Sequence, residues 1–181
     1  MTSPNGTLIV RPNVSLTDDA GNKWSFKNGQ VYKNGNVDAL TNRVIAIGFI
    51  NGKVVQENTD KLWWAKTYQG YDGWGTPGNG DGHIANPFPA SRYGTTIVPQ
   101  STTPLVDRSG NLWWIEAGKV IENGVVDRLT NGVIEMAIDI DGKIYQENNN
   151  KLWWQKTYQG YDGWGTPGVM AMFLLRNPQL R

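Results

Sequence analysis

KLWWAKTYQGYDGWGTPG, residues 61–78, returns as KLWWQKTYQGYDGWGTPG at residues 151–168, and the two stretches differ only at Ala65 and Gln155. Upstream, DDAGNKW (18–24) matches DRSGNLW (107–113), KNGNVDALTNRVI (33–45) matches ENGVVDRLTNGVI (122–134), and NGKVVQEN (51–58) matches DGKIYQEN (141–148). The offset changes from 89 to 90 between Ile45 and Asn51, so the second copy carries one extra residue, as is typical of a strand end or bulge. The repeat predicts two copies of one structural unit.

The repeat divides the chain into a first module at 1–78, a connector at 79–98, a second module at 99–168 and a tail at 169–181. The connector is rich in Gly and Pro and has no periodicity, and its length indicates that it wraps a surface or contacts a partner. The tail carries an uninterrupted apolar run from Val169 to Leu175. Because an exposed run of this kind is a liability, we expect it to add an edge strand to its own sheet or to dock on another protein.

The pattern of short β-rich segments predicts an all-β fold. KWSFK, RVIAIGFI and KVVQE alternate or are rich in β-branched residues, and no window shows helical spacing. Asn-Gly and Asp-Gly pairs favour tight hairpins and occur at Asn28-Gly29, Asn34-Gly35, Asn51-Gly52, Asn123-Gly124 and Asp141-Gly142. We therefore expect two tandem small antiparallel β-sandwich or barrel-like modules built from hairpin meanders. Propeller blades would fit only in an oligomer, because two blades cannot close a ring.

Composition excludes several classes of function. The chain has 17 basic and 16 acidic residues, no cysteine and one histidine, His83. A near-neutral chain lacks the positive field that nucleic-acid binding needs, and without cysteine there are no disulfides or thiolate metal sites. A lone histidine argues against a histidine-based triad. No apolar stretch is long enough to span a membrane, and the N-terminus does not resemble a signal peptide. We expect no cofactor and no metal.

Nine tryptophans are an unusual number for 181 residues. Neighbouring side chains of a strand point to opposite faces, so one member of each Trp-Trp pair is expected to face inward and the other to face solvent, a second sheet or a partner. The pairs are Trp63-Trp64, Trp113-Trp114 and Trp153-Trp154. Trp24 and Trp113 begin a strand after a Gly-Asn turn, and we expect both to pack in a core.

The glycine-rich block TYQGYDGWGTPG is the candidate binding site in each copy. A glycine-rich loop rarely buries three aromatic rings, and ring faces beside polar groups suit the apolar face of a sugar. Gln69 and Gln159 could grip hydroxyls together with the two aspartates. The predicted ligand-binding residues are Tyr68, Tyr71, Asp72 and Trp74, with Tyr158, Tyr161, Asp162 and Trp164. Two alternatives stay open: the rings cover the core of their own module or fill the interface between the modules, or they contact a protein partner.

Catalysis and calcium binding have weaker support. Glu57 with Asp72, and Glu147 with Asp162, are the acids repeated beside aromatic residues. A glycosidase needs two carboxylates set apart in a cleft, and nothing in the spacing requires that geometry, so we expect no enzyme. The turns at Asp18 and Asp107 resemble oxygen-rich calcium turns, but lack the further ligands of a full calcium loop. Hairpin turns closed by side-chain-to-backbone hydrogen bonds are the favoured interpretation.

The ordered set D-x-x-G-N-x-W, N-G, Q-E-N and L-W-W occurs at 18–64 and again at 107–154. It resembles a module repeated in bacterial extracellular proteins, some of them carbohydrate-active, and in phage structural proteins. The TYQGYDGWGTPG extension is not part of that pattern. The resemblance implies a non-catalytic accessory β module that binds glycans or other surfaces, and it assigns no ligand residues here.

The sequence thus predicts a non-catalytic surface-binding or structural protein with glycan-adhesive modules. A phage virion component (a capsid decoration, fibre or tail protein) is the favoured setting, located on the virion or an extracellular surface. The expected partners are a polysaccharide or cell-surface glycan, a virion or other structural protein bound through the tail, and possible further copies of the chain. Two modules would raise avidity for a repetitive glycan. The alternative is a carbohydrate-binding module associated with a secreted polysaccharide-degrading enzyme.

Overall fold

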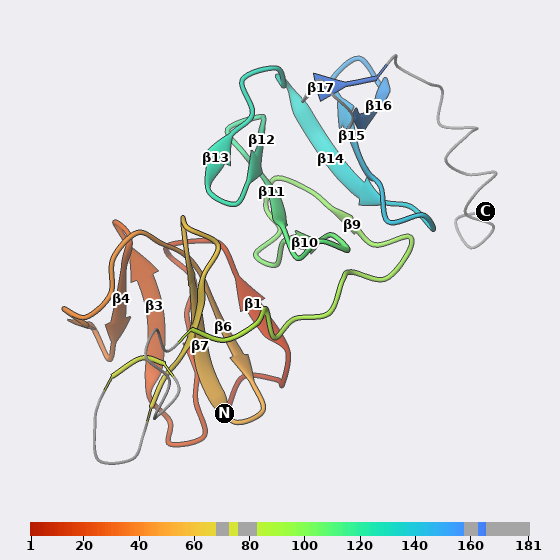
Figure 1. The fold of residues 1–181 in the computed structure, drawn as a ribbon. Coiled ribbons are helices and arrows are strands. Elements are labelled where there is room, and N and C mark those ends of the chain that lie inside the picture. Colours follow the sequence, from red (N-terminus) through yellow and green to blue (C-terminus); the bar gives the residue numbers. More distant parts are fainter. Residues whose placement is uncertain (68–72, 76–82, 158–162, 166–181) are drawn as a thin grey trace. The chain divides into compact units, whose positions relative to one another are not determined.

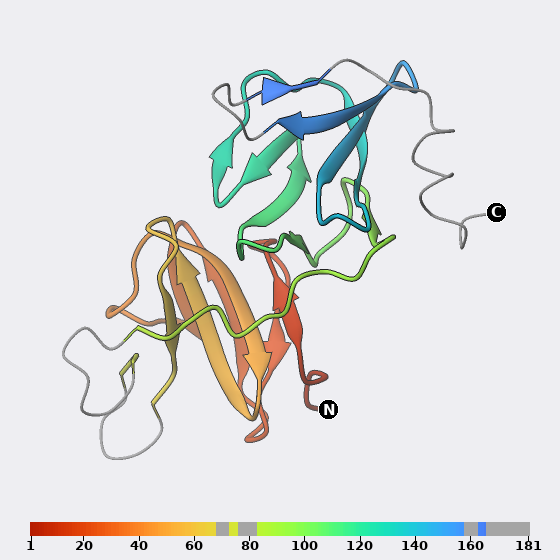
Figure 2. The same cartoon turned by 45° about the vertical axis from the view of Figure 1, so that its right-hand side comes forward.

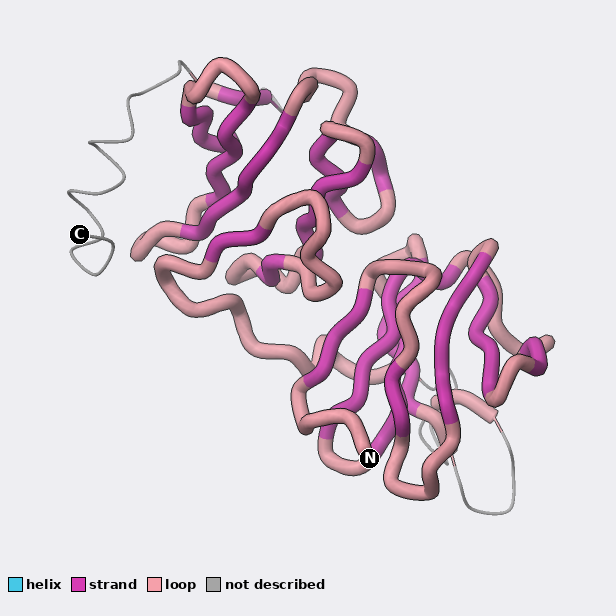
Figure 3. Tube along the Cα trace, turned by 180° about the vertical axis from the view of Figure 1, so that it is seen from behind, coloured by secondary structure: helices cyan, strands magenta, loops and turns pink. Residues whose placement is uncertain are grey.

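The computed structural model describes residues 1–67, 73–75, 83–157 and 163–165. These residues form an all-β fold, as the sequence predicts, and Figure 3 shows strands joined by turns throughout. The chain divides into two compact units, Met1–Phe88 and Pro89–Arg181. Over the described ranges, no helix is long and apolar enough to cross a membrane.

The first unit contains two four-stranded antiparallel sheets (Figure 1). One sheet is a meander in the order β2-β3-β4-β5, whereas the other has the order β1-β6-β7-β8, so β1 returns to the far side of β6. The strands of the first sheet are β2 (Leu16–Thr17), β3 (Lys23–Lys27), β4 (Gln30–Lys33) and β5 (Asn36–Val37). Those of the second are β1 (Thr7–Ile9), β6 (Val44–Ile50), β7 (Lys53–Asn58) and β8 (Trp63–Ala65).

The second unit repeats this topology. Its meander sheet has the order β10-β11-β12-β13, and its other sheet the order β17-β16-β15-β14-β9. The meander comprises β10 (Leu105–Val106), β11 (Leu112–Glu116), β12 (Lys119–Glu122) and β13 (Val125–Val126). The other sheet comprises β9 (Thr96–Ile97), β14 (Val133–Ile138), β15 (Ile144–Asn148), β16 (Trp153–Thr157) and β17 (Gly163–Trp164).

The segment expected to be a connector is divided between the two units. Ile84 pairs with Trp63 in the first unit, and the boundary falls between Phe88 and Pro89. β9, at Thr96–Ile97, already pairs with β14 of the second unit. The second unit therefore starts earlier than the predicted residue 99, and residues 83–88 complete the first unit. The predicted tail, 169–181, lies outside the described residues.

Asn-Gly turns close the predicted hairpins. At Asn28-Gly29, φ is 52° and 74°, and at Asn51-Gly52 it is 50° and 71°, the left-handed values that a two-residue hairpin turn requires. In the second unit the position equivalent to Asn28 is Ala117, which is held at φ 48°. An alanine in this region is strained.

The extra residue of the second copy lies in the turn between β14 and β15. Ala46 faces Glu57 in the first unit and Glu135 faces Glu147 in the second, so β6 and β14 are in the same register against their partner strands. The insertion therefore follows Ile138, and a strand-end position agrees with the prediction. The longer turn is held by Asp139, whose carboxylate accepts hydrogen bonds from the backbone of Asp141 and Lys143.

The core of the first unit lies between its two sheets. Trp24, Phe26 and Val31 of the meander pack with Ile47, Phe49 and Val54 of the other sheet. Trp24 and Trp113 are both fully buried, which confirms the prediction for these two residues. Trp63 and Trp153 are buried while Trp64 and Trp154 are partly exposed, but Trp113 and Trp114 are both buried. Neither member of the Trp113-Trp114 pair faces solvent, because both faces of β11 are covered at this point.

Residues 84–88 cover the other face of the β6–β7 sheet, and this segment crosses β6 and β7 in both Figure 1 and Figure 2. The Phe88 ring packs on Trp63, with the ring centroids 5.3 Å apart. It also lies directly on Gly48, where an added Cβ would overlap the ring. Because both faces of this sheet are covered, β6 is buried along almost its whole length.

Candidate functional site

A buried Asp–Lys–Trp cluster fastens the end of the repeated block to the first unit. Asp38 follows β5, Lys66 follows β8, and Trp74 pairs with Lys66 across an isolated bridge. Asp38 Oδ2 accepts hydrogen bonds from Lys66 Nζ at 2.9 Å and from Trp74 Nε1 at 3.0 Å. The cluster therefore joins residues of both sheets and of the glycine-rich block.

The cluster is an ion pair in an aromatic surrounding. The Lys66 side chain is 1% exposed, and its ammonium lies 5.8 Å from the Trp24 ring centroid and 5.1 Å from that of Trp74. Ring faces attract a desolvated cation. Burial alone would raise the pKa of Asp38, but the hydrogen bonds from Lys66 and Trp74 outweigh it and lower the pKa below its ordinary value. The carboxylate is thus held in its charged form.

The second unit builds the same cluster. Asp127 Oδ2 accepts hydrogen bonds from Lys156 Nζ at 3.2 Å and from Trp164 Nε1 at 3.0 Å. Lys156 lies 5.6 Å from the Trp113 ring centroid and 5.4 Å from that of Trp164. The near-identity of the two repeated blocks therefore preserves a structural contact.

This cluster accounts for one of the three aromatic residues in each predicted binding block. Trp74 packs against the core and meets Trp24 edge to face, at 6.2 Å and 82°. Trp74 and Trp164 remain only partly exposed. The glycan role of the block stays a prediction, since its other members lie outside the described residues: Tyr68, Tyr71, Asp72, Tyr158, Tyr161 and Asp162, together with Gln69 and Gln159.

The candidate calcium turns are closed by hydrogen bonds. Asp18 Oδ1 accepts from the backbone N–H groups of Ala20 and Asn22, and Oδ2 accepts from Trp24 Nε1 at 2.8 Å. Burial would raise the pKa of Asp18, but hydrogen bonds led by Asn22 and Trp24 lower it. Asp107 makes the same bond to Trp113 at 2.9 Å, so these turns position the core tryptophans. Within the described ranges no group of three or more acidic or histidine side chains is arranged to hold a metal ion.

Glu57, one of the weighed catalytic acids, is the cross-strand partner of Trp63 and is buried rather than set in an open cleft. It is 1% exposed, and burial raises its pKa to about 8, against partial compensation from Lys61 and Trp63. In the second unit, Glu147 lies opposite Glu135 on β14. Burial, reinforced by the charge of Glu147, raises the pKa of Glu135. The weighed partners Asp72 and Asp162 lie outside the described residues.

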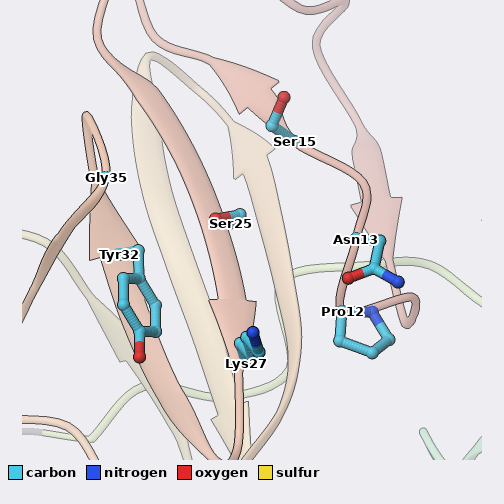
Figure 4. Close-up of a pocket in the computed structure, with 7 residues that line it drawn as sticks. All are labelled: Pro12, Asn13, Ser15, Ser25, Lys27, Tyr32 and Gly35. Carbon is cyan, nitrogen blue, oxygen red and sulfur yellow. The ribbon is translucent and has the colours of Figure 1, made fainter.

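An open trough crosses the outer face of the meander sheet in the first unit. It encloses a volume of about 300 Å³ and is lined by Pro12, Asn13, Ser15, Ser25, Lys27, Tyr32 and Gly35. Figure 4 shows Ser25 and Lys27 on β3, with Tyr32 on one side and Pro12, Asn13 and Ser15 on the other. Ser25 and Tyr32 are cross-strand partners, so β pairing sets the ring beside the hydroxyl.

Sequence reasoning missed this trough. In KWSFK, Trp24 and Phe26 are buried, so Ser25 and Lys27 share the opposite face. That alternation was available from the sequence. The arrangement of Pro12, Asn13 and Ser15 beside β3 depends on the path from β1 to β2, and no local pattern indicates it.

Comparison with protein-family models, with curated proteins and with solved structures found no match to this chain.

Proposed function

We propose that this chain is a non-catalytic surface-binding protein whose first unit holds an acidic glycan in the trough on β3 and β4. The supporting observation is the composition of the trough. It sets the partly exposed ring of Tyr32 beside hydroxyl, amide and ammonium groups from Ser25, Asn13 and Lys27.

Each group in the trough has a role in this proposal. The Tyr32 ring offers an apolar face to a sugar ring, while its hydroxyl remains a polar contact. Ser25, Ser15 and Asn13 supply donors and acceptors for sugar hydroxyls. Lys27, an exposed ammonium, favours a carboxylate or sulfate on the glycan. A shallow trough suits one face of an extended polymer rather than an enclosed small molecule.

The second unit has a different surface at the equivalent place. Trp114 stands at the position of Ser25 and Ile121 at that of Tyr32, and they are 5% and 4% exposed. Glu116 replaces Lys27. We therefore assign glycan contact in the meander sheet to the first unit alone. For the whole chain, the setting we propose remains a phage virion component, on the strength of the sequence resemblance.

Affinity gel electrophoresis tests the proposal, with polygalacturonate as the acidic and dextran as the neutral polysaccharide. The wild-type chain is expected to be retarded by polygalacturonate, less so at high salt because screening weakens the Lys27 contact. Tyr32→Ala with Lys27→Ala removes the retardation. Lys23→Ala is the matched control, since Lys23 is an exposed lysine of the same strand outside the trough. Equal retardation of the double variant and the control, or no retardation of the wild type, rejects the proposal.

A further inference from the structure

The repeat extends beyond the glycine-rich blocks into the tail (169–181). The dipeptide Asn-Pro occurs at 86–87 and at 177–178 and nowhere else in the chain. It begins eight residues after the last glycine of the first block and nine residues after that of the second, so the two copies differ there by one residue. Because one structural unit is repeated, the segment equivalent to 84–88 is 175–179.

In the first unit, residues 84–88 cover the outer face of the sheet at Trp63. The backbone N–H of Ile84 donates to the carbonyl oxygen of Trp63 at 2.7 Å, in an isolated bridge beside β8. The Phe88 ring packs on the Trp63 ring and is itself buried. Under this cover Trp63 is only 2% exposed.

The second unit buries the equivalent tryptophan to nearly the same degree. Trp153 is 4% exposed and forms an apolar cluster with Ala137, against which Tyr145 packs. A ring on the outer face of a sheet reaches this burial when a further layer of chain lies on it, as residues 84–88 lie on Trp63. The segment that the repeat assigns to this layer, 175–179, lies outside the described residues.

The sheet positions beneath the two segments differ in step with the segments themselves. Phe88 lies directly on Gly48, where an added Cβ would overlap the ring. The second unit has Ala137 at that position, with Tyr145 as its cross-strand partner, so part of the space that Phe88 fills is already taken. In the tail, Gln179 stands at the position of Phe88 and is the smaller side chain. Because protein interiors are densely packed, a larger sheet residue requires a smaller residue above it.

The charge of the tail also complements this face. Glu135 lies opposite Glu147 in the second unit, whereas Ala46 lies opposite Glu57 in the first. The cation near Glu147 is Lys151, at 3.8 Å and with its side chain 73% exposed, and an exposed pair of this kind contributes little. The tail has two arginines and no acid, whereas the covering segment of the first unit has no Lys, Arg, Asp or Glu. The face with the additional carboxylate is thus matched by the basic segment.

We propose that residues 175–179 cover the outer face of the β14–β15–β16 sheet in their own unit, as residues 84–88 do in the first. Leu175 takes the place of Ile84 beside Trp153, and Arg176 brings positive charge to Glu135 and Glu147. The apolar run that ends at Leu175 is thereby used within the chain, where an exposed run would be a liability. Its own unit, and not another protein, is the partner of this part of the tail.

Paramagnetic relaxation measured by nuclear magnetic resonance tests this in the full chain. The chain has no cysteine, so a nitroxide can be attached at a single introduced site. A nitroxide at Leu180→Cys, just beyond the proposed contact, is expected to erase the amide signals of β14–β16 and to affect those of β11 and β12 less. Ala85→Cys is the matched control, because Ala85 is an exposed residue of the covering segment in the first unit, and it should act in the same way on β6–β8.

Two further samples separate the possible occupants. A mixture of ¹⁴N protein carrying the nitroxide with ¹⁵N protein lacking it reports contacts between copies, and no loss of signal is expected there. Leu175→Asp should restore the signals of β14–β16 in the labelled protein, whereas Met170→Asp, at an apolar tail residue outside the contact, should not. Circular dichroism checks that both variants keep their β structure.

Two outcomes would overturn the proposal. If the Leu180→Cys nitroxide leaves β14–β16 unchanged, or acts most strongly elsewhere, the tail does not lie on this face and another protein is its partner. If the signals of β14–β16 are lost in the mixture, the tail of a second copy lies there instead.

Discussion

The two units share the buried hydrogen bonds and ion pairs that hold each of them together, and they differ in the residues on their outer surfaces. Both bury a core tryptophan bonded to an aspartate, Trp24 to Asp18 and Trp113 to Asp107, and both hold the Asp–Lys–Trp cluster. On the outer face of the meander sheet, Ser25 and Tyr32 of the first unit give way to Trp114 and Ile121 in the second.

The sheets that contain β7 and β15 also differ between the two units. Val55 and Ala65 are cross-strand partners in the first unit, whereas Tyr145 and Gln155 stand there in the second and are joined by a hydrogen bond of 3.0 Å. The Tyr145 hydroxyl also lies 3.1 Å from Asp139 Oδ2 of the longer turn, so its proton is shared between these two acceptors. The one difference between the repeated blocks, Ala65 against Gln155, thus belongs to a group of coupled changes. Contacts that hold the fold are shared, and surfaces have become specific to each unit.

The largest expected effect comes from breaking the cluster in one unit only. Asp38→Asn leaves the Lys66 charge buried without its counter-charge, and removing one partner of a buried pair costs about 3–5 kcal/mol. Hydrogen exchange read by mass spectrometry should show faster exchange in residues 1–67 and little change in 89–157. Asp127→Asn is the matched variant and should give the reverse pattern. If both variants loosen both units equally, the units are not independent.

The next effect is the pH dependence that Glu57 gives to the stability of the first unit. The pKa of Glu57 is about 8 when folded against 4.5 ordinarily, so between these values the folded unit keeps a proton that the unfolded chain releases. The free energy of unfolding therefore falls as pH rises from 4.5 toward 8, by up to about 1.4 kcal/mol per pH unit. Glu57→Gln should flatten this dependence and be the more stable protein above neutral pH. Urea titrations at several pH values measure it, and parallel curves for the two proteins would contradict the assignment.

Gly48 lies on the sheet face of the first unit that residues 84–88 cover, and the equivalent position in the second unit is not a glycine. An alanine there would overlap Phe88 and crowd the Thr7 carbonyl oxygen, so Gly48→Ala should destabilise the first unit by about 1–3 kcal/mol. The equivalent residue of the second unit is Ala137, which faces Tyr145. Ala137→Gly should cost about 1–2 kcal/mol, through added backbone freedom and the loss of a buried methyl group. If the Gly48→Ala variant unfolds at the same temperature as the wild type, residues 84–88 do not pack tightly on this face of the sheet.

The smallest effect exchanges one turn residue between the units. Ala117 occupies the left-handed position that Asn28 fills in the first unit. Asparagine tolerates this conformation better than alanine, so Ala117→Asn should stabilise the second unit by about 0.5–1 kcal/mol. Asn28→Ala should destabilise the first unit by a similar amount. If both substitutions shift the midpoint temperature of thermal unfolding in the same direction, this explanation is wrong.

The sequence predicted what depends on local chemistry. Asn28-Gly29 encodes a turn within its own two residues, and Trp24 enters the core because it alternates with exposed neighbours. The Asp–Lys–Trp cluster was not predicted, because Asp38 meets residues 28 and 36 positions away. No periodicity links such distant residues. The sequence of the glycine-rich block therefore indicates a binding loop, whereas Trp74 and Trp164 in fact anchor the block to its own unit.

Divergence of the outer surfaces is the central claim, and a nuclear magnetic resonance titration of the full chain tests it most directly. An acidic oligogalacturonide is added to ¹⁵N-labelled protein while the backbone amides of both meander sheets are followed. The account predicts shifts in Lys23–Lys33, around Ser25 and Tyr32, and none in Leu112–Glu122. Equal shifts in both stretches, or shifts in the second alone, would contradict it.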